Sequence, residues 1–235
     1  MKTDILCITA HPDDVELGCG GTIASATSAG KTVAIVDMTR GELGSRGTPE
    51  LRKEEATKAA KILGVAHREI LDLGDGAFEE TQENLRTLVD RIRLFQPDIV
   101  ITNALSDRHP DHGRGAQLVT RACFLAGLIN FESEQQEPWR PRNIYYEMQD
   151  RYFHPDVIID ISDFFEKKME AVMAFASQFH KPDGGNEPNT PISSPQFLSF
   201  LEARAREMGR IIGAEYGEGF NTERPIGSKD LNSLI

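Results

Sequence analysis

Two short segments of the sequence carry histidine and aspartate in the same order, and these side chains are common metal ligands. The first segment, HPDD, begins at His11, and the second, HPDH, begins at His109. If Pro12 begins a helical turn, His11 and Asp14 project to one side, where an imidazole and a carboxylate can share a cation. The second tetrad repeats this spacing with His109 and His112. Together they offer more ligands than one ion needs, and three protein ligands plus water is the arrangement of a catalytic zinc site.

The first tetrad also lies where a dinucleotide-binding loop would begin, between an apolar run and a glycine-rich stretch. Gly18, Gly20 and Ala24 follow a degenerate GxGxxxA pattern, and Asp37 ends the next apolar run. A pyrophosphate-binding loop, however, turns directly from strand to glycine, so that backbone N–H groups meet the anion. Here residues 11–17 intervene, and the carboxylates among them would repel a phosphate. The sequence therefore favours a metal site over a phosphate site.

The elements that position the tetrads are indicated by short apolar runs that alternate with helical stretches. Buried strands are predicted over residues 5–10, 32–39, 68–73, 97–104, 143–149 and 156–162. One helix has Thr48 as its N-cap and Gly64 after its last apolar residue. Other helices are predicted over residues 81–95, 115–129, 164–179 and 196–212. This order predicts an α/β fold, a Rossmann-like three-layer αβα sandwich with a mainly parallel sheet.

Sites in open parallel sheets form beyond the carboxyl ends of the strands. HPDD follows the first predicted strand and SDRHPDH follows the fourth, so we expect both tetrads at one edge of the sheet. Residues 180–195 are rich in Pro, Gly and Asn, which predicts a long loop of the kind that serves as a lid or an assembly contact. A chain of 235 residues can fold without disulfide or metal staples, and we expect one domain over residues 1–235.

The composition excludes several classes of partner. The formal net charge of -11 argues against wrapping a phosphate backbone, which needs a clustered basic surface, so no nucleic-acid partner is expected. No apolar run approaches the roughly 20 residues of a membrane span, and no signal peptide precedes the first strand. The 3 cysteines form no CxxC pair, which suits a reducing compartment. We therefore expect a cytoplasmic protein without a membrane partner.

The tetrads belong to a longer pattern that spans nearly the whole chain. HPDDVELGCGGT is followed by MTRGELGSRGTPELRKEEA, then by SDRHPDH, and finally by AEYGEGF. With these motifs in this order the sequence resembles the zinc-dependent N-acetylglucosaminyl deacetylases of the LmbE-like or PIG-L-like family. It is most similar to the bacillithiol biosynthesis deacetylases, which act on N-acetylglucosaminyl malate. The resemblance implies a single deacetylase domain that hydrolyses an amino-sugar amide to acetate and a free amine, and a homo-oligomer, either a trimer or a hexamer.

The resemblance implies a metal-binding or catalytic role for four residues of the tetrads. His11, Asp14 and His112 would bind one Zn²⁺ per subunit, although other divalent metals suit the same ligands. Because zinc lowers the pKa of a bound water to about 7, Asp13 would suffice as the general base that takes its proton. The resulting hydroxide would attack the acetyl carbonyl.

Other residues receive roles by the same resemblance. His109 would polarise the carbonyl and stabilise the oxyanion, or protonate the leaving amine, and Asp111 would orient its ring. Arg52 and Asp75 would contact the sugar hydroxyls or the aglycone. The competing interpretations are a surface ion pair with a neighbouring glutamate for Arg52 and a turn role for Asp75. Some relatives carry a tyrosine that assists the oxyanion near the position where this chain has Phe197.

Alternative functions would use the same residues. The substrate could be another N-acetylglucosamine conjugate or a chitin oligomer. A metal phosphoesterase commonly uses two ions about 4 Å apart, whereas the sequence offers one coherent ligand triad. A metal- or sugar-binding module without turnover would have no need of Asp13 and His109 as proton carriers. Replacing Asp13 by alanine separates these hypotheses, because the enzyme would keep its metal and lose turnover.

Overall fold

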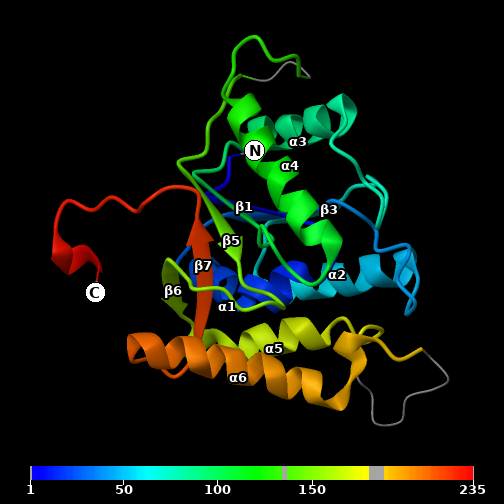
Figure 1. The fold of residues 1–235 in the computed structure, drawn as a ribbon, viewed down its shortest axis with the longest axis vertical. Helices are drawn as coiled ribbons and strands as arrows, with labels where there is room; N and C mark the ends of the chain where they lie inside the picture. The colour runs from blue at the N-terminus through cyan, green and yellow to red at the C-terminus, as the bar shows by residue number, and fades with distance from the viewer. Residues whose placement is uncertain (1, 134–136, 180–187, 235) are drawn as a thin grey trace.

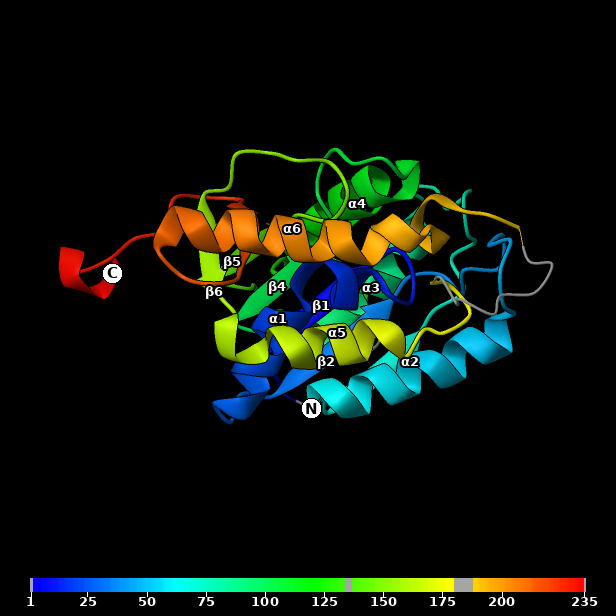
Figure 2. The same cartoon turned by 90° about the horizontal axis from the view of Figure 1, so that it is seen from below.

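A seven-stranded sheet runs through the centre of the protein, and helices cover both of its faces (Figure 1, Figure 2). The computed structural model describes residues 2–133, 137–179 and 188–234. In the order in which they lie across the sheet, the strands are β3 (His67–Ile70), β2 (Val33–Asp37), β1 (Ile5–Thr9), β4 (Ile99–Thr102), β5 (Asn143–Glu147), β7 (Gly217–Thr222) and β6 (Val157–Asp160). Strands β1 to β5 run parallel, and β7 is antiparallel to both neighbours. The predicted αβα sandwich is confirmed.

The helices of the two outer layers are α1 (Asp14–Ser28), α2 (Pro49–Leu63), α3 (Gln82–Phe95), α4 (Pro110–Ala126), α5 (Phe165–Met173) and α6 (Pro195–Ile212). The ends of α2 agree with the sequence prediction. The side chain of Thr48 accepts a hydrogen bond from the backbone N–H of Leu51, and Gly64 ends the helix with a φ of 74°. Of the helices in the described part of the chain, none has the length and apolar character that crossing a membrane requires.

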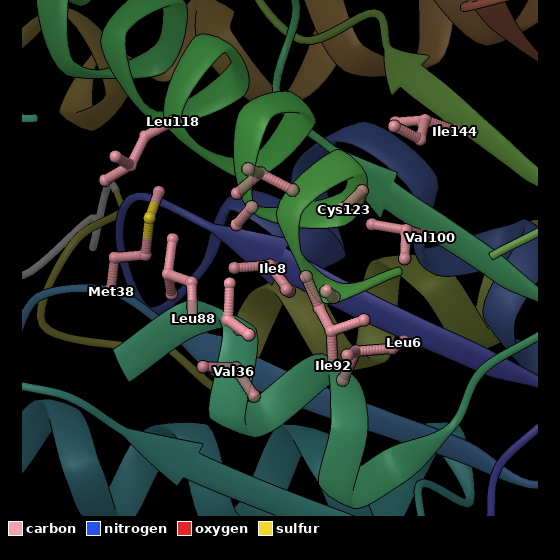
Figure 3. Close-up of a cluster of buried hydrophobic side chains, with 14 of the residues drawn as sticks. Leu6, Ile8, Val36, Met38, Leu88, Ile92, Val100, Leu118, Cys123 and Ile144 are labelled. Atoms are coloured by element: carbon pink, nitrogen blue, oxygen red, sulfur yellow. The ribbon is translucent and has the colours of Figure 1, made fainter. Parts of the chain in front are cut away.

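Two hydrophobic cores lie on opposite faces of the sheet. In one core Leu6 and Ile8 of β1 pack with Leu88 and Ile92 of α3, and all four are fully buried (Figure 3). The other core contains Cys7 of β1 together with residues of α1, α2, α5 and α6. Alternate residues of β1 therefore enter different cores, as in any strand covered on both faces. Burial of each large side chain contributes roughly 1.5–3 kcal/mol, so β1 and the start of the loop that follows it are firmly placed.

Strand β7, which lies between β5 and β6, is not among the strands predicted from the sequence. Gly217 and Gly219 lower the β propensity of this segment. A Cβ atom on Gly217 would lie 2.8 Å from Cγ2 of Ile158 and 2.9 Å from the backbone N of Gly209 in α6. Glycine is therefore required because α6 approaches the strand closely.

Two helices have bounds that differ from the prediction. The helix predicted over residues 164–179 ends at Met173, and the helix predicted from residue 115 begins already at Pro110. Pro110 occupies the first helical position after His109, where its missing N–H has no cost. The second tetrad therefore forms the N-terminus of α4.

The glycine-rich stretch after the first tetrad forms a kink in α1. Cys19 has a non-helical φ of -138°, which separates a first turn carrying Asp14 from the rest of the helix. Glu218 of β7 accepts hydrogen bonds from the backbone N–H groups of Gly21 (3.0 Å) and Thr22 (2.7 Å), where the helix resumes. A helix N-terminus favours negative charge, and here a side chain of the protein supplies it.

The buried Lys168 and the partly buried Arg204 complete this kink. Lys168 donates hydrogen bonds to Oε1 of Glu218 at 2.5 Å and to the carbonyl oxygen of Leu17 at 3.0 Å. Arg204 donates to the same carbonyl at 3.0 Å. Leu17 ends the first turn of α1, where carbonyl groups lack partners within the helix. Glu218 thus occupies the position that a pyrophosphate would need, in agreement with the preference for a metal site.

Candidate active site

The two tetrads meet at the edge of the sheet where the neighbouring parallel strands β1 and β4 end. His11 follows β1, whereas His109 caps α4 and His112 lies in its first turn. The ring centroid of His11 lies 4.6 Å from that of His109 and 5.6 Å from that of His112. The structure therefore brings together the two loops that the sequence predicts at one edge.

Asp14 lies between two imidazoles. Its Oδ2 is 3.5 Å from Nδ1 of His11, and its Oδ1 is 3.3 Å from Nε2 of His112. All three side chains are buried. Burial alone would raise the pKa of Asp14, but the two imidazoles hold this pKa well below its ordinary value. The carboxylate is therefore charged and able to attract a cation.

Possible metal ligands form two overlapping groups among the described residues. Ligand atoms of His11, His109 and His112 lie within 4.8 Å of one another, and so do those of His11, Asp75 and Asp111. His11 belongs to both groups because its Nε2 lies 3.1 Å from Asp75 and 3.5 Å from Asp111. Together with Asp14, this centre has more nitrogen and oxygen donors than one ion needs.

Each imidazole beside Asp14 has a carboxylate on its other nitrogen. Nδ1 of His112 contacts Oδ2 of Asp107 at 2.7 Å, and Nε2 of His11 contacts Oδ1 of Asp75 at 3.1 Å. Carboxylates in such positions fix the tautomer and orientation of metal-ligating histidines. When the ring protons lie on the nitrogens that face Asp75 and Asp107, Nδ1 of His11 and Nε2 of His112 can bind a cation. Asp107 is not among the residues predicted from the sequence, although its place at a strand end within SDRHPDH is a signal for it.

The same carboxylates favour positive charge on the imidazoles. Burial lowers the pKa of His112, but Asp14 and Asp107 outweigh burial and raise this pKa to about 9. For His11, hydrogen bonds with Asp111 and other carboxylates outweigh burial and raise its pKa well above the ordinary value. The protein therefore stabilises positive charge at this centre, and a bound metal ion would replace protons there.

Asp13, the N-cap of α1, has a strained backbone conformation. Its φ of 126° lies in the region that favours glycine, and such strain costs of order 1–3 kcal/mol. Oδ2 of Asp13 lies 3.2 Å from Nη2 of Arg52. Burial raises the pKa of Asp13 to about 7, although the charge of Arg52 acts in the opposite direction. A carboxyl group with a pKa near neutrality can both accept and release a proton.

Arg52 is buried, with an exposed fraction of 5%, so the surface ion pair considered from the sequence is wrong. Its Nη2 also donates a hydrogen bond to the carbonyl oxygen of Pro12 at 2.6 Å. Arg52 thus connects α2 to the backbone and the carboxylate of the HPDD turn. It also lines the cavity described below.

The predicted contact between the Asp111 carboxylate and the His109 ring is wrong. Nδ1 of His109 instead accepts a hydrogen bond from the backbone N–H of Asp111 at 3.3 Å, since His109 is the N-cap of α4. The carboxylate accepts from the backbone N–H of Gly76 at 2.7 Å and faces His11. The free N–H groups of the first turn point back toward the cap. Because Nδ1 is an acceptor, a neutral His109 carries its proton on Nε2.

Asp75 is buried beside His11. Its Oδ2 accepts a hydrogen bond from the backbone N–H of Leu43 at 2.9 Å, which ties the turn after β3 to the loop after β2. Phe197 lies on α6 and stacks on Phe179, with ring centroids 5.8 Å apart. It packs against the core of α1, α2 and α5 and is not among the described residues that line the cavity.

A cavity of about 420 Å³ lies over this centre. Its lining includes His11, Asp13, Asp14, His109 and His112 together with Leu43, Arg46, Asp75, Arg108, Gln149, Gln178, Thr190 and Ile192. The volume is typical of a small-molecule site, for which about 300–1,000 Å³ is usual. Residues 190–192 belong to the segment predicted to form a lid or assembly contact, whereas residues 180–187 of that segment lie outside the described residues.

Comparison with known proteins gives one family match, and the relatives include two named as deacetylases and one named as a hydratase. Residues 6–123 match the protein family described as PIG-L: GlcNAc-PI de-N-acetylase. The diacetylchitobiose deacetylase of Thermococcus kodakarensis is 34% identical over 231 residues, covering 92% of this chain and 81% of that protein. A probable N-acetyl-alpha-D-glucosaminyl L-malate deacetylase 2 of Bacillus anthracis is 28% identical over 200 residues, covering 76% and 84%. The 4-oxalmesaconate hydratase of Pseudomonas putida is 28% identical over 191 residues, covering 74% of each chain.

A solved structure shares the fold over nearly the whole length. The conserved protein TT1542 from Thermus thermophilus superimposes with a TM-score of 0.87 at 35% identity, covering 96% of this chain and 97% of that one. The family match includes both tetrads, HPDD after β1 and HPDH at the start of α4, which build the centre. The chain therefore belongs to the PIG-L family of deacetylases.

Proposed function

We propose that the protein is a metal-dependent hydrolase that removes the acetyl group from an N-acetylglucosamine derivative, releasing acetate and a free amine. The observation that carries this proposal is that His11, Asp14, His112, Asp13 and His109 line a single cavity. One relative is named as a deacetylase of diacetylchitobiose and another as a probable deacetylase of N-acetyl-alpha-D-glucosaminyl L-malate, which supports the substrate class.

The proposed ion is Zn²⁺, held by His11, Asp14 and His112. Two imidazole nitrogens and one carboxylate oxygen suit zinc, and they also suit Fe²⁺, Mn²⁺, Ni²⁺ and Co²⁺. The fit is supported by Asp75 and Asp107, which engage the opposite nitrogens of the two rings. When bound, the ion supplies Lewis-acid activation of water and of the amide carbonyl.

Asp13 is proposed to transfer a proton during the reaction, and His109 is proposed to stabilise the negative charge that develops on the substrate. Asp13 acts as the general base, because burial raises its pKa to about 7 and so makes both protonation states accessible. His109 donates the N–H of Nε2 to the carbonyl oxygen as negative charge develops there, since its Nδ1 is occupied as an acceptor. Arg52 holds the HPDD turn and acts through Asp13.

The proposal also specifies the aglycone, the group attached to the sugar. We infer that it is malate, so that the substrate is N-acetylglucosaminyl malate. The motif pattern and the Bacillus anthracis relative support this substrate. Arg108 lines the cavity and pairs with Asp150 at 2.7 Å, and a malate carboxylate could replace that partner. The Thermococcus kodakarensis relative supports diacetylchitobiose as the alternative.

A panel assay tests both parts of the proposal. Acetate and free amine are measured for N-acetylglucosamine, its malate conjugate and diacetylchitobiose, using zinc-loaded, chelated and reloaded protein. Hydrolysis should stop on chelation and return on reloading, and the ratio of kcat/KM values identifies the aglycone. If the zinc-loaded protein released acetate from none of these amides, the proposed activity would be rejected.

A further inference from the structure

Both carboxylate oxygens of Asp14 are held by side-chain amides from the ends of neighbouring strands. Nδ2 of Asn103, directly after β4, donates to Oδ2 of Asp14 at 3.0 Å. Nε2 of Gln149, after β5, donates to Oδ1 at 2.8 Å. Asn103 is fully buried, and Gln149 has an exposed fraction of 9%. Neither residue belongs to the two tetrads or to the site predicted from the sequence.

The surrounding hydrogen bonds fix which end of each amide faces Asp14. Oδ1 of Asn103 accepts from the backbone N–H of Ala10 at 2.8 Å, so its Nδ2 must point to the carboxylate. Oε1 of Gln149 accepts from Nδ2 of Asn103 at 3.4 Å, so its Nε2 also faces Asp14. The amide orientations therefore follow from the network itself. Because β4 and β5 are hydrogen-bonded neighbours in the sheet, both donors closely follow rigid elements that hold them side by side.

We propose that Asn103 and Gln149 are positioning residues that orient Asp14 and so determine the affinity of the centre for its metal ion. This inference rests on the proposed function, in which Asp14 is a ligand. Neutral amides fix the carboxylate without cancelling its charge, whereas an arginine or lysine there would compete with the cation. Oδ2 of Asp14 also accepts from the backbone N–H of His11 at 2.9 Å, so Oδ1, which lies 3.3 Å from Nε2 of His112, is the oxygen that keeps a lone pair for the ion.

The test compares Gln149→Leu and Asn103→Asp with the wild-type protein. Gln149→Leu removes one donor, while Asn103→Asp keeps the acceptor for Ala10 and replaces the other donor by a carboxylate. The matched control is Gln178→Leu, because Gln178 lines the same cavity but donates to Arg46 and Ser177. For each metal-free protein the Tm is recorded, the Kd for Zn²⁺ is measured by competition with a chelator, and the visible absorption spectrum of the Co²⁺ form is compared.

We expect Gln149→Leu and Asn103→Asp to weaken zinc binding about 10-fold to 100-fold and to change the Co²⁺ spectrum, whereas Gln178→Leu leaves both unchanged. If Asn103→Asp fails to fold, Gln149→Leu decides. Wild-type affinity and spectrum in Gln149→Leu would overturn the inference and leave the proposed function standing. A wild-type protein that binds no divalent ion would overturn both, so the two failures are distinguishable.

Discussion

Asp107 contacts Nδ1 of His112 at 2.7 Å, on the side of the ring opposite to Asp14. Its other oxygen accepts hydrogen bonds from the backbone N–H groups of Arg108 and Arg151 at 2.8 and 2.7 Å. These backbone contacts orient the Asp107 carboxylate independently of its contact with the imidazole. It holds the ring proton on Nδ1 and leaves Nε2 as the nitrogen that a metal ion can use.

Asp107→Asn should weaken metal binding. The amide can keep the contacts to the backbone, but its NH₂ group would then face Nδ1 of His112 and favour the tautomer with a proton on Nε2. Zinc affinity, measured by chelator competition, should fall about 10-fold to 100-fold. Asp160→Asn is the control, because Asp160 is exposed and contacts Ser162. An unchanged Kd in Asp107→Asn would show that the tautomer of His112 is set in another way.

Asp13→Asn should separate metal binding from turnover. Asparagine has the shape of aspartate but cannot accept the proton of the attacking water, so kcat should fall by about 10²-fold to 10⁴-fold. The zinc content of the purified variant should remain equal to that of the wild type. Asp72→Asn, at an exposed carboxyl group that pairs with Arg40, should behave as wild type in both measurements. Retention of full turnover in Asp13→Asn would remove this residue from the mechanism.

Glu147→Gln should change the pH dependence of stability. Burial, together with the neighbouring Cys19, raises the pKa of Glu147 well above its ordinary value. Above a pH of about 4.3 the unfolded chain has lost a proton that the folded protein keeps, so the free energy of unfolding falls as pH rises. This loss amounts to at most about 1.4 kcal/mol per pH unit and ends above the pKa of the folded state.

Glutamine resembles the protonated acid and does not titrate, so the advantage of Glu147→Gln over wild type should grow as the pH rises from about 4.3 toward the pKa that the carboxyl group has in the folded protein. Urea unfolding of the metal-free proteins across this range measures it. Glu202→Gln, at a residue whose half-exposed side chain pairs with Arg206, should show no such trend. Parallel stability curves for Glu147→Gln and wild type would contradict the prediction.

Glu218→Gln should destabilise the protein strongly. It leaves the buried Lys168 without its counter-charge, and breaking a buried ion pair costs about 3–5 kcal/mol. It also weakens the acceptor at the N–H groups of Gly21 and Thr22. Chemical denaturation measures the effect, with Glu202→Gln as the control expected to cost less than about 1 kcal/mol. A loss as small as that of the control would mean that the kink in α1 is stabilised without Glu218.

Much of the fold was predictable because the strands of a parallel sheet covered on both faces are continuous apolar runs. The runs around Ile5 and Ile99 became neighbouring strands, and this adjacency brings the tetrads together. The segment Gly217–Thr222 carried no such signal. Gly217 is needed because α6 approaches the strand closely, and a local sequence pattern contains no information about such a tertiary contact.

The candidate site was predictable in its ligand types and less so in the contacts that surround the ligands. Spacing placed His11 and Asp14 on one side of a turn, but it could not show which carboxylate would meet which ring. Asp111 follows His109 closely in sequence yet faces His11, because the start of α4 directs its side chain away from the cap. Asp75 reaches His11 from a loop 64 residues away in sequence. Such pairings depend on the packing of loops from different strands.

The backbone conformation of Asp13 bears on how this position can vary. With a φ of 126°, glycine alone would adopt the observed geometry without strain. Asp13→Gly would relieve this strain, but it would also leave the buried Arg52 without the carboxylate that lies 3.2 Å from its Nη2, so the gain in stability would be lost. The strained backbone at this position is therefore explained by what the carboxylate contacts, namely the Arg52 guanidinium that ties α2 to the HPDD turn.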